Sequence, residues 1–205
     1  MKVLIGTTNP SKVEQFAAML SGFGLEFITL ADLGIADEPK ESGRTPGENA
    51  GIKAAFYGQY AENVICADSG LYFDCLALDD SRQPGLHVRT PGGGKRLDDE
   101  EMIAYYANLA HSLGGKVMAY YLDGAAVMAG GKVFTFQETR EEARAKGFYI
   151  VDVPSAERRE GWPIDSVSLM QDGTYFLDPN RKVQVQQTAA YKPRLRAFLL
   201  ASMGL

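Results

Sequence analysis

The chain has 205 residues, of which 45% are hydrophobic, so it can bury the core of one α/β domain with an extra lobe or of two small domains. Its net charge of −5 argues against a general nucleic-acid-binding protein, because such proteins usually carry a basic excess. The sequence contains no run of about 18 apolar residues, so neither a membrane span nor a membrane partner is expected.

The small numbers of cysteines and histidines limit the kinds of metal and catalytic site that are expected. Cys66 and Cys75 lie in apolar segments without metal-ligand spacing, which favours reduced, buried thiols in a cytoplasmic protein. The N-terminus leads directly into a predicted strand and lacks the apolar region of a signal peptide. His87 and His111 are the only histidines, so a His-rich metal site and most His-based triads are not expected.

Hydrophobic periodicity predicts two strand–helix pairs at the start of the chain. The expected elements are a strand at 2–6, a helix from about 10 to 20, a strand at 25–30 and a helix starting near 46. Asn9 is a good N-cap for the first helix, and Pro10 suits its first position. For the second helix, Thr45 and Glu48 fit a capping box. A polar loop separates the second strand from the second helix.

The middle of the chain is richer in strands. The segment "VICAD" (64–68) predicts a buried strand that ends on Asp68, followed by an extended or bent segment. An acid-capped helix is expected at 98–113 after a long loop. Three strand-like runs between 116 and 137 then predict a β-meander, with turns at Asp123-Gly124 and at Gly130-Gly131. The following "ETREEARAKG" fits either a helical turn or a charged edge strand.

A further strand at 148–153 and a C-terminal helix beginning near Lys192 complete the prediction. The order βαβα, then a meander, then a helix indicates an α/β fold with a mixed central sheet flanked by helices. We expect one domain over 1–205 with a β-meander lobe around 116–155.

The opening segment "TTNPSK" has the chemistry of a phosphate site. A helix that starts directly after a strand presents free N–H groups and the positive end of its dipole. Thr7 and Asn9 add side-chain hydrogen bonds, and Lys12 adds a positive charge. Asn9 alone is explained by helix capping. Lys12 is not, because a cation in the first turn opposes the dipole unless an anion answers it.

Two further segments carry charged residues of interest. In "ESGRTPGENAGIKAAF", Glu41 lies in a loop and caps no obvious helix, while Lys53 by itself is more typical of a solvated surface lysine than of a ligand. In "CADSGL", Asp68 follows a buried strand, which would place it at the carboxyl edge of the sheet, where ligands of open α/β folds gather. A simple turn is the alternative for Asp-Ser-Gly.

Together, "TTNPSK", "ESGRTPGENAGIKA", "ADSGL" and "PGLHVR" resemble the inosine triphosphate pyrophosphatase family in order and in spacing. The resemblance covers most of the chain and is strongest for residues 1–90. It implies an elongated α/β protein with two lobes and a cleft, usually a homodimer. It also implies hydrolysis of a nucleoside triphosphate between the α and β phosphates, with Mg²⁺, or alternatively Mn²⁺, as cofactor. Deaminated or modified purines would be the substrates.

The resemblance also implies roles for individual residues. Asp68 would bind metal or act as general base, and Glu41 would be a second metal ligand. Lys12 would act with Asp68 in catalysis and hold phosphate. The other residues that would contact the nucleotide through its phosphates are Thr7, Asn9, Lys53 and Ser69. Arg89 matches a family arginine and would be a further substrate contact.

The C-terminal half resembles the family less closely. "GWPIDS" aligns with the motif that contains the base-stacking aromatic, which makes Trp162 and Asp165 candidate substrate contacts. Trp162 fits a core aromatic about as well. "YKPRLRAF" places Arg194 on a family arginine, but Pro193 stands where the family has histidine, and Lys192 is the nearest replacement for a family lysine.

A second departure concerns the metal site: the family has two acids before Ser-Gly-Leu, and the first is Ala67 here. The phosphate side of the family pattern is thus largely intact, while the base side has lost a hydrogen-bonding partner on which selectivity would depend. Two alternatives to a pyrophosphatase follow. One is a nucleotide-binding or regulatory module that has lost catalysis, and the other is a hydrolase of another nucleotide phosphoanhydride.

Overall fold

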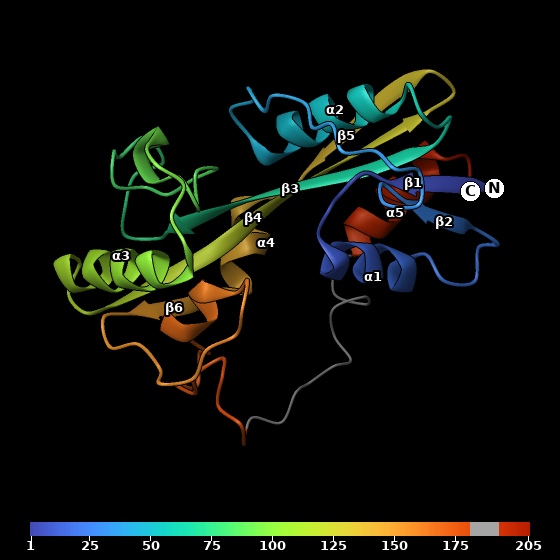
Figure 1. Cartoon of the computed structure of the whole chain (residues 1–205). Coiled ribbons are helices and arrows are strands. Elements are labelled where there is room, and N and C mark those ends of the chain that lie inside the picture. Colours follow the sequence, from blue (N-terminus) through green and yellow to red (C-terminus); the bar gives the residue numbers. More distant parts are fainter. Residues whose placement is uncertain (181–192) are drawn as a thin grey trace. The chain divides into compact units, whose positions relative to one another are not determined.

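The computed structural model describes residues 1–180 and 193–205, and the statements below concern these residues (Figure 1). Their contacts divide them into two compact units. Unit 1 holds residues 1–69, 123–138 and the described C-terminal residues, and unit 2 holds residues 70–122 and 139–180.

The described elements run in the following chain order: β1 (Lys2–Ile5), α1 (Pro10–Met19), β2 (Glu26–Thr29), α2 (Pro46–Tyr57), β3 (Val64–Phe73), the 3₁₀ turn η1 (Pro91–Gly93), α3 (Asp99–Ser112), β4 (Lys116–Ala129), β5 (Lys132–Gln137), α4 (Arg140–Ala145), β6 (Phe148–Val151), the 3₁₀ turn η2 (Pro163–Val167), β7 (Ser168–Leu169) and α5 (Pro193–Ser202). The strands form a mixed sheet in the order β2-β1-β3-β4-β6-β7, with β5 paired to β4. β1 is parallel to β2 and β3, whereas β4 is antiparallel to β5 and β6. The predicted mixed sheet flanked by helices is confirmed.

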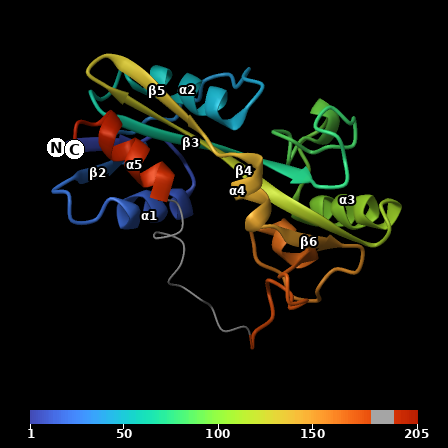
Figure 2. The same cartoon turned by 180° about the vertical axis from the view of Figure 1, so that it is seen from behind.

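Unit 1 has helices on both faces of its part of the sheet (Figures 1 and 2). Successive side chains of a strand point to opposite faces, and β1 follows this rule. Val3 and Ile5 pack in the cluster that contains Leu199 of α5 and residues of α1. Leu4 points the other way and packs with Ala54 of α2. The two faces of β1 are both buried, so the sequence reads as a continuous apolar run.

Unit 2 buries its strands in the same manner. Phe73 of β3 and Ile150 of β6 pack against Tyr106 of α3 on one face. On the other face, Tyr120 of β4 packs with Ala143 of α4. The charged segment that fitted either a helical turn or an edge strand is therefore a helix, and its small residue Ala143 explains why α4 can lie close to the sheet.

Two predicted strand boundaries are wrong. The first is the end of β3, which passes through Asp68 and continues to Phe73. The continuation is stabilised where Leu71 and Gly85 exchange both backbone hydrogen bonds, each 2.9 Å long. Asp68 still lies beyond the end of β1, because the last β1 residue, Ile5, is in register with Ile65.

The second error is the predicted turn at Asp123-Gly124, because β4 runs straight through these residues as one strand of 14 residues. Asp-Gly is typical of hairpin turns, but Gly124 is needed here for another reason. A Cβ on Gly124 would clash with the backbone of Pro46 and Gly47, where α2 begins. The glycine allows close packing of strand and helix. The predicted hairpin at Gly130-Gly131 is confirmed, and it joins β4 to β5.

The helix ends agree closely with the predictions. The Asn9 side chain accepts a hydrogen bond from the Ser11 N–H at 2.9 Å, and Pro10 is the first residue of α1. Thr45 caps α2 by accepting from the Glu48 N–H. The reciprocal half of the predicted capping box differs, because the Glu48 carboxylate accepts from the Arg44 N–H at 2.6 Å instead of from Thr45.

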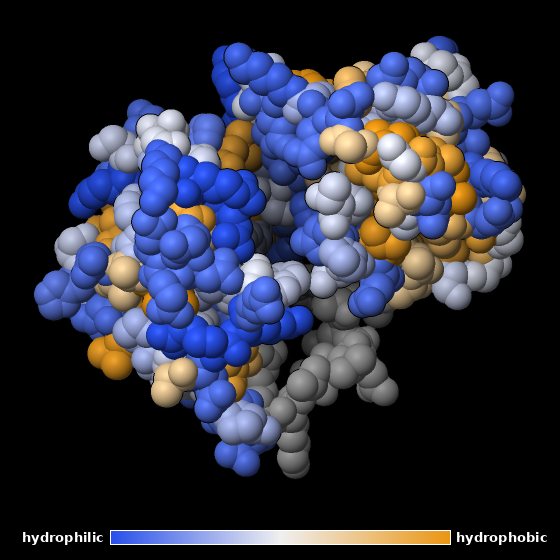
Figure 3. All heavy atoms as spheres, viewed as in Figure 1, coloured by the Kyte–Doolittle hydropathy of each residue, from blue (hydrophilic) through white to orange (hydrophobic). Residues whose placement is uncertain are grey.

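None of the described helices is long and apolar enough to cross a membrane. The side of the molecule shown in Figure 3 is largely hydrophilic, with one larger group of hydrophobic residues over unit 1. Exposed large apolar side chains of unit 1 include Leu33 and Tyr60.

Candidate functional site

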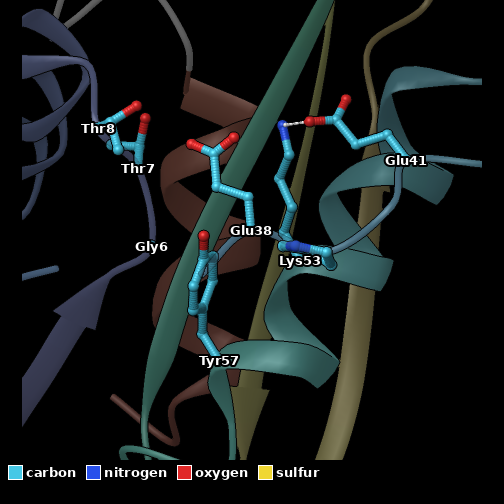
Figure 4. A pocket seen from close by; sticks show the side chains of 8 residues that line it. Gly6, Thr7, Thr8, Glu38, Glu41, Lys53 and Tyr57 are labelled. Atoms are coloured by element: carbon cyan, nitrogen blue, oxygen red, sulfur yellow. Dashed lines mark ion pairs between the residues drawn. The ribbon is translucent and has the colours of Figure 1, made fainter. Parts of the chain in front are cut away.

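A polar cavity of about 130 Å³ lies in unit 1. Its lining comes from the end of β1, from the loop before α2 and from α2 itself: Gly6, Thr7, Thr8, Glu38, Pro39, Glu41, Lys53 and Tyr57. Three of the predicted site residues, Thr7, Glu41 and Lys53, are in this set. Figure 4 shows the Thr7 and Thr8 hydroxyls across the cavity from Lys53.

The wall formed by Thr7 leads directly into α1. Thr7 accepts a hydrogen bond from the Asn9 N–H at 3.2 Å, and Asn9 in turn caps the helix. The cap uses the Asn9 carbonyl oxygen, which leaves the amide NH₂ group as a donor. Lys12 lies in the first turn of α1. Backbone and side-chain donors therefore gather where the helix begins, which is the arrangement that anions favour.

The opposite wall contains an ion-pair cluster centred on Lys53. The Lys53 Nζ lies 2.8 Å from Glu41 Oε1 and 3.2 Å from Asp68 Oδ1. Figure 4 shows Lys53 rising from α2 towards the Glu41 carboxylate. The Lys53 and Asp68 side chains are only 17% and 14% exposed, so their charges interact with little screening by water.

The charge of Lys53 is set by these neighbours. Burial opposes the ammonium charge, but the adjacent charge of Asp68 and the hydrogen bond to Glu41 outweigh it, so the pKa of Lys53 is raised. Lys53 therefore keeps its positive charge well above neutral pH. The buried, ion-paired position of Lys53 favours a ligand-binding role over that of a solvated surface lysine.

Cys66 is fully buried, and the charges of two predicted lysines act on its thiol. Burial raises the pKa of the Cys66 thiol to about 12, and the charges of Lys53 and Lys12 both oppose this rise. Lys12 of α1 and Lys53 of α2 thus act electrostatically on the same atom, although they lie on different helices. Unit 1 therefore brings Lys53, Glu41 and Asp68 together, and Lys12 lies in the first turn of α1, the helix that follows the Thr7 wall.

Ser69 belongs to a separate polar network that includes Asp123 of β4, the strand next to β3 in the sheet. Its hydroxyl donates to Asp123 Oδ1 at 2.7 Å, and the Asp123 N–H donates to Glu138 Oε2 at 3.2 Å. Ala67, which replaces the first family acid, packs against the apolar cluster of α1 and α5.

In unit 2, the predicted residue Arg89 is held by the carboxylate of Asp99. Asp99, at the start of α3, accepts from Arg89 Nη1 at 2.9 Å and from the Gly161 N–H at 2.7 Å. Arg89 Nη2 also donates to the Gly161 carbonyl at 3.1 Å. Next along the chain, Trp162 is 38% exposed. Its exposure rules out the interpretation of Trp162 as a core aromatic.

Two electrostatic features complete this second group. The Arg159 guanidinium lies 4.8 Å from the centre of the Trp162 ring and contacts Asp165 at 3.5 Å. Burial acts to raise the pKa of Asp99, but the hydrogen bonds from Gly161 and Arg89 outweigh it and hold that pKa below its usual value.

Arg194 belongs to unit 1, where its guanidinium lies 5.4 Å from the Phe136 ring centre. Lys192 lies outside the described residues.

The carboxylates beside the cavity have the chemistry of ligands for a hard cation such as Mg²⁺. Glu41 and Asp68 supply carboxylate oxygens, which hard cations prefer. The described residues contain no group of three or more acidic, histidine or cysteine side chains placed to hold a metal by themselves. Mg²⁺ does not need such a cage, because it commonly binds one or two carboxylates together with water and substrate phosphates.

A model of the Ham1 family matches residues 3–166. The chain belongs to the Ham1 family. The matched range contains every predicted site residue except Lys192 and Arg194. Because curated relatives of this Ham1 chain are named dITP/XTP pyrophosphatases, the resemblance found in the sequence is confirmed.

Relatives and solved structures extend the comparison over the whole Ham1 chain. A dITP/XTP pyrophosphatase of Thermoanaerobacter pseudethanolicus is 28% identical over 205 residues, covering 98% of this chain and 97% of the relative. One of Haemophilus influenzae is 36% identical over 111 residues, covering 54% of each. The solved Ham1 protein of Staphylococcus aureus has a TM-score of 0.69 at 21% identity, with 98% and 100% of the two chains covered. That of Coxiella burnetii has a TM-score of 0.67 at 19% identity, with 98% and 95% covered.

Sequence reasoning missed several residues of this Ham1 site. Asn49, Glu38 and Tyr57 were not singled out, although Asn49 lies four residues before Lys53 and hence on the same face of α2. That spacing is a signal that could have found it. Asp99 gave no signal, because acids in the first turn of a helix are already explained by the dipole.

Proposed function

We propose that this chain hydrolyses a nucleoside triphosphate between the α and β phosphates, releasing a nucleoside monophosphate and pyrophosphate. The expected substrates are deaminated or modified purine nucleotides. Mg²⁺ is the expected cofactor, and Mn²⁺ is the alternative.

The chain is an enzyme of the nucleoside triphosphate pyrophosphatase class, which are hydrolases. It belongs to the Ham1 family, and a relative named dITP/XTP pyrophosphatase is similar to it along almost its entire length. Hydrolysis of noncanonical purine triphosphates is therefore the activity that the family supports.

One observation carries the finer proposal: Lys53 bridges Glu41 and Asp68 beside a cavity whose other wall is Thr7. A triphosphate needs cations and hydrogen-bond donors around its charge, and its hydrolysis needs little covalent chemistry from the protein. The cavity combines such donors with carboxylates in a single place. An ion pair that served only stability would not need to line a polar cavity.

The binding roles follow from the two walls. The free N–H groups at the start of α1, with Thr7, Asn9 and Lys12, would hold phosphate oxygens from one side. Lys53 would hold them from the other side, and its raised pKa keeps it charged at the pH of the cell. Ser69 would help to position phosphate, with its hydroxyl held by Asp123.

The chemical step uses Asp68 as the proton acceptor. A water oxygen forms a bond to the α-phosphorus while the bond from that phosphorus to the α,β-bridging oxygen breaks. Pyrophosphate leaves with the electron pair of the broken bond, and the proton of the water passes to the Asp68 carboxylate. Bound Mg²⁺ would neutralise charge that develops on the phosphates, with Glu41 and Asp68 as its protein ligands.

Unit 2 carries the residues that the family resemblance links to the base. Trp162 would stack on the base, since base–aromatic stacking needs an exposed ring. Asp165 would contribute a hydrogen-bond acceptor, and Arg89 a positive charge held in place by Asp99. Arg194 and Lys192 remain further proposed contacts.

A panel of nucleotides tests the function directly. Purified protein is incubated with Mg²⁺ or Mn²⁺ and with the triphosphates of inosine, xanthosine, adenosine and guanosine, and the products are separated. We expect pyrophosphate and monophosphate, with inosine or xanthosine triphosphate preferred. Release of orthophosphate alone would instead favour a hydrolase of another phosphoanhydride.

A binding module is the second candidate, because Ala67 removes one family acid and Pro193, the first residue of α5, stands where the family has histidine. Thermal-shift measurements separate the two. Stabilisation by nucleotides without Mg²⁺-dependent turnover would favour the binding module.

We further propose a cytoplasmic homodimer. The two cysteines are both free, and free thiols are typical of a reducing compartment. Cys66 is buried as predicted, whereas the prediction of a buried thiol is wrong for Cys75, which is exposed. The hydrophobic group on unit 1 is a surface that a second copy could cover (Figure 3). Light scattering coupled to gel filtration would measure the molar mass, and a monomer at micromolar concentration would refute the dimer. No nucleic-acid or membrane partner is proposed.

A further inference from the structure

Asn49 connects the two carboxylate-bearing segments of the site. It is buried in the first half of α2, with only 3% of its surface exposed. Its Nδ2 amide donates to Asp68 Oδ2 at 3.0 Å, and its Oδ1 accepts from the Gly43 N–H at 2.8 Å. A buried amide that makes both bonds in opposite directions has its orientation fixed, because flipping it would lose both.

The Asp68 carboxylate is held by two residues of one helix. Asn49 and Lys53 are four residues apart and therefore lie on the same face of α2. Asn49 donates to one Asp68 oxygen and Lys53 to the other. A single donor would allow the carboxylate to rotate, whereas two donors on different oxygens define its plane.

The loop that carries Glu41 is tied to the same side chain. Gly43 lies two residues after Glu41, and a Cβ on Gly43 would lie 2.7 Å from Asn49 Oδ1 and 2.8 Å from Asn49 N. Only a glycine lets the loop come this close. Asn49 therefore holds the Glu41 loop through Gly43 at the same time as it holds Asp68.

We propose that Asn49 is a positioning residue for the hydrolytic step: it orients the Asp68 carboxylate for proton transfer and fixes the Glu41 loop beside it. The inference rests on the proposed function, in which Asp68 accepts the proton. Asn49 makes no contact with the phosphates in this account. Its loss should therefore affect turnover more than binding.

The sharpest test is the nearly isosteric Asn49→Asp variant. The new carboxylate still accepts from the Gly43 N–H, but it cannot donate to Asp68 and it repels that carboxylate. We expect kcat to fall about 10- to 100-fold, as for other residues that orient a reacting group. KM, and the Kd of a non-hydrolysable α,β-methylene triphosphate analogue, should change less than about threefold.

Two companion variants separate orientation from loop tethering. Asn49→Ala should lose turnover similarly and also speed hydrogen exchange at the Gly43 N–H, which Asn49→Asp should leave slow. Glu48→Ala is the matched control, because Glu48 holds the same loop through the Arg44 N–H without touching Asp68. It should keep wild-type kcat. If Asn49→Asp fails to fold by circular dichroism, Asn49→Ser, whose shorter side chain withdraws the donor from Asp68, takes its place with the same expectations for kcat and KM.

A crystal structure of Asn49→Asp gives a readout that does not depend on activity. We expect the Asp68 side chain to turn away from position 49 while α2 stays in place. An unchanged Asp68 rotamer, or wild-type kcat in Asn49→Asp, would overturn the inference. If the wild-type protein releases no pyrophosphate, the proposed function fails, and the crystal structure still decides whether Asn49 orients Asp68.

Discussion

The two groups of candidate residues are held in place in different ways. In unit 1, Lys53 is bonded to Glu41 and Asp68, so predicted site residues hold one another. In unit 2, Arg89 is held by Asp99, which the sequence did not indicate. Trp162 presents an exposed ring beside an arginine. Polyphosphate chemistry requires a tight set of opposite charges, whereas base recognition requires an open surface with a few oriented groups.

The comparison predicts different effects for the two groups. Changes in unit 1 should reduce kcat for every substrate, because they remove interactions with charge that develops during the reaction. Changes in unit 2 should raise KM and alter the preference among bases.

The largest effect is expected for Asp68→Asn. The amide cannot accept the proton from water, and general base catalysis commonly contributes about 10²–10⁴-fold. We expect kcat to fall by that factor for all nucleotides while the circular dichroism spectrum is retained. A variant with a wild-type rate of pyrophosphate release would remove Asp68 from the chemical step.

Lys53→Met should have the next largest effect. It keeps the apolar stem but leaves Glu41 and Asp68 without their shared cation, and loss of one electrostatic contact to the reacting group commonly costs about 10²–10³-fold in kcat. Lys2→Met is the matched control, since Lys2 pairs with Glu26 on the exposed end of β1. Equal rates for the two variants would show that the Lys53 charge has no catalytic role.

Trp162→Ala should raise KM for inosine triphosphate about 5- to 100-fold with little change in kcat, because stacking on one base is worth about 1–3 kcal/mol. Phe23→Ala is a suitable control. Phe23 is similarly exposed and also lies under an arginine, with Arg196 5.2 Å from its ring centre, but it lies in unit 1. Steady-state kinetics compare the two, and an equal rise in KM for both would argue against base stacking by Trp162.

The smallest effect is a pH-dependent one at Asp99. Its pKa is lowered in the folded protein, so its contribution to stability is present above its unfolded pKa of about 3.9 and is lost as pH falls through the folded value. Asp99→Asn should therefore lower Tm by about 1–4 °C at pH 7. Near pH 3 that difference should shrink. A difference that grows on acidification would mean that Asp99 acts in another way.

Much of unit 1 could be predicted from the sequence, for physical reasons that particular residues illustrate. Asn9-Pro10 specifies a helix start through local hydrogen bonding, so α1 begins where expected. Lys12 and Glu41 were found because each is unexplained by local structure. Whether Lys12 and Glu41 belong to one site depends on long-range packing, which local sequence does not encode. The family resemblance predicted that shared site.

Other features depend on contacts that local sequence does not encode. Asp123-Gly124 has the composition of a turn, and only the approach of α2 shows that its glycine serves packing inside a strand. β3 passes beyond Asp68 because Gly85, distant in sequence, pairs with Leu71. Asn49 was overlooked because Asn inside a helix usually has no specific partner, and its partners lie on β3 and in the preceding loop.

We propose that the polyphosphate binds in the unit 1 cavity between Thr7 and Lys53. A crystal structure with Mg²⁺ and a triphosphate carrying a non-hydrolysable α,β-methylene bridge tests it most directly. We predict phosphate oxygens within hydrogen-bonding distance of Thr7 and the Lys53 ammonium, with the metal on the side of Glu41 and Asp68. A well-ordered triphosphate bound elsewhere, with Lys53 still closed on Glu41 and Asp68, would show that this cavity is not the polyphosphate site.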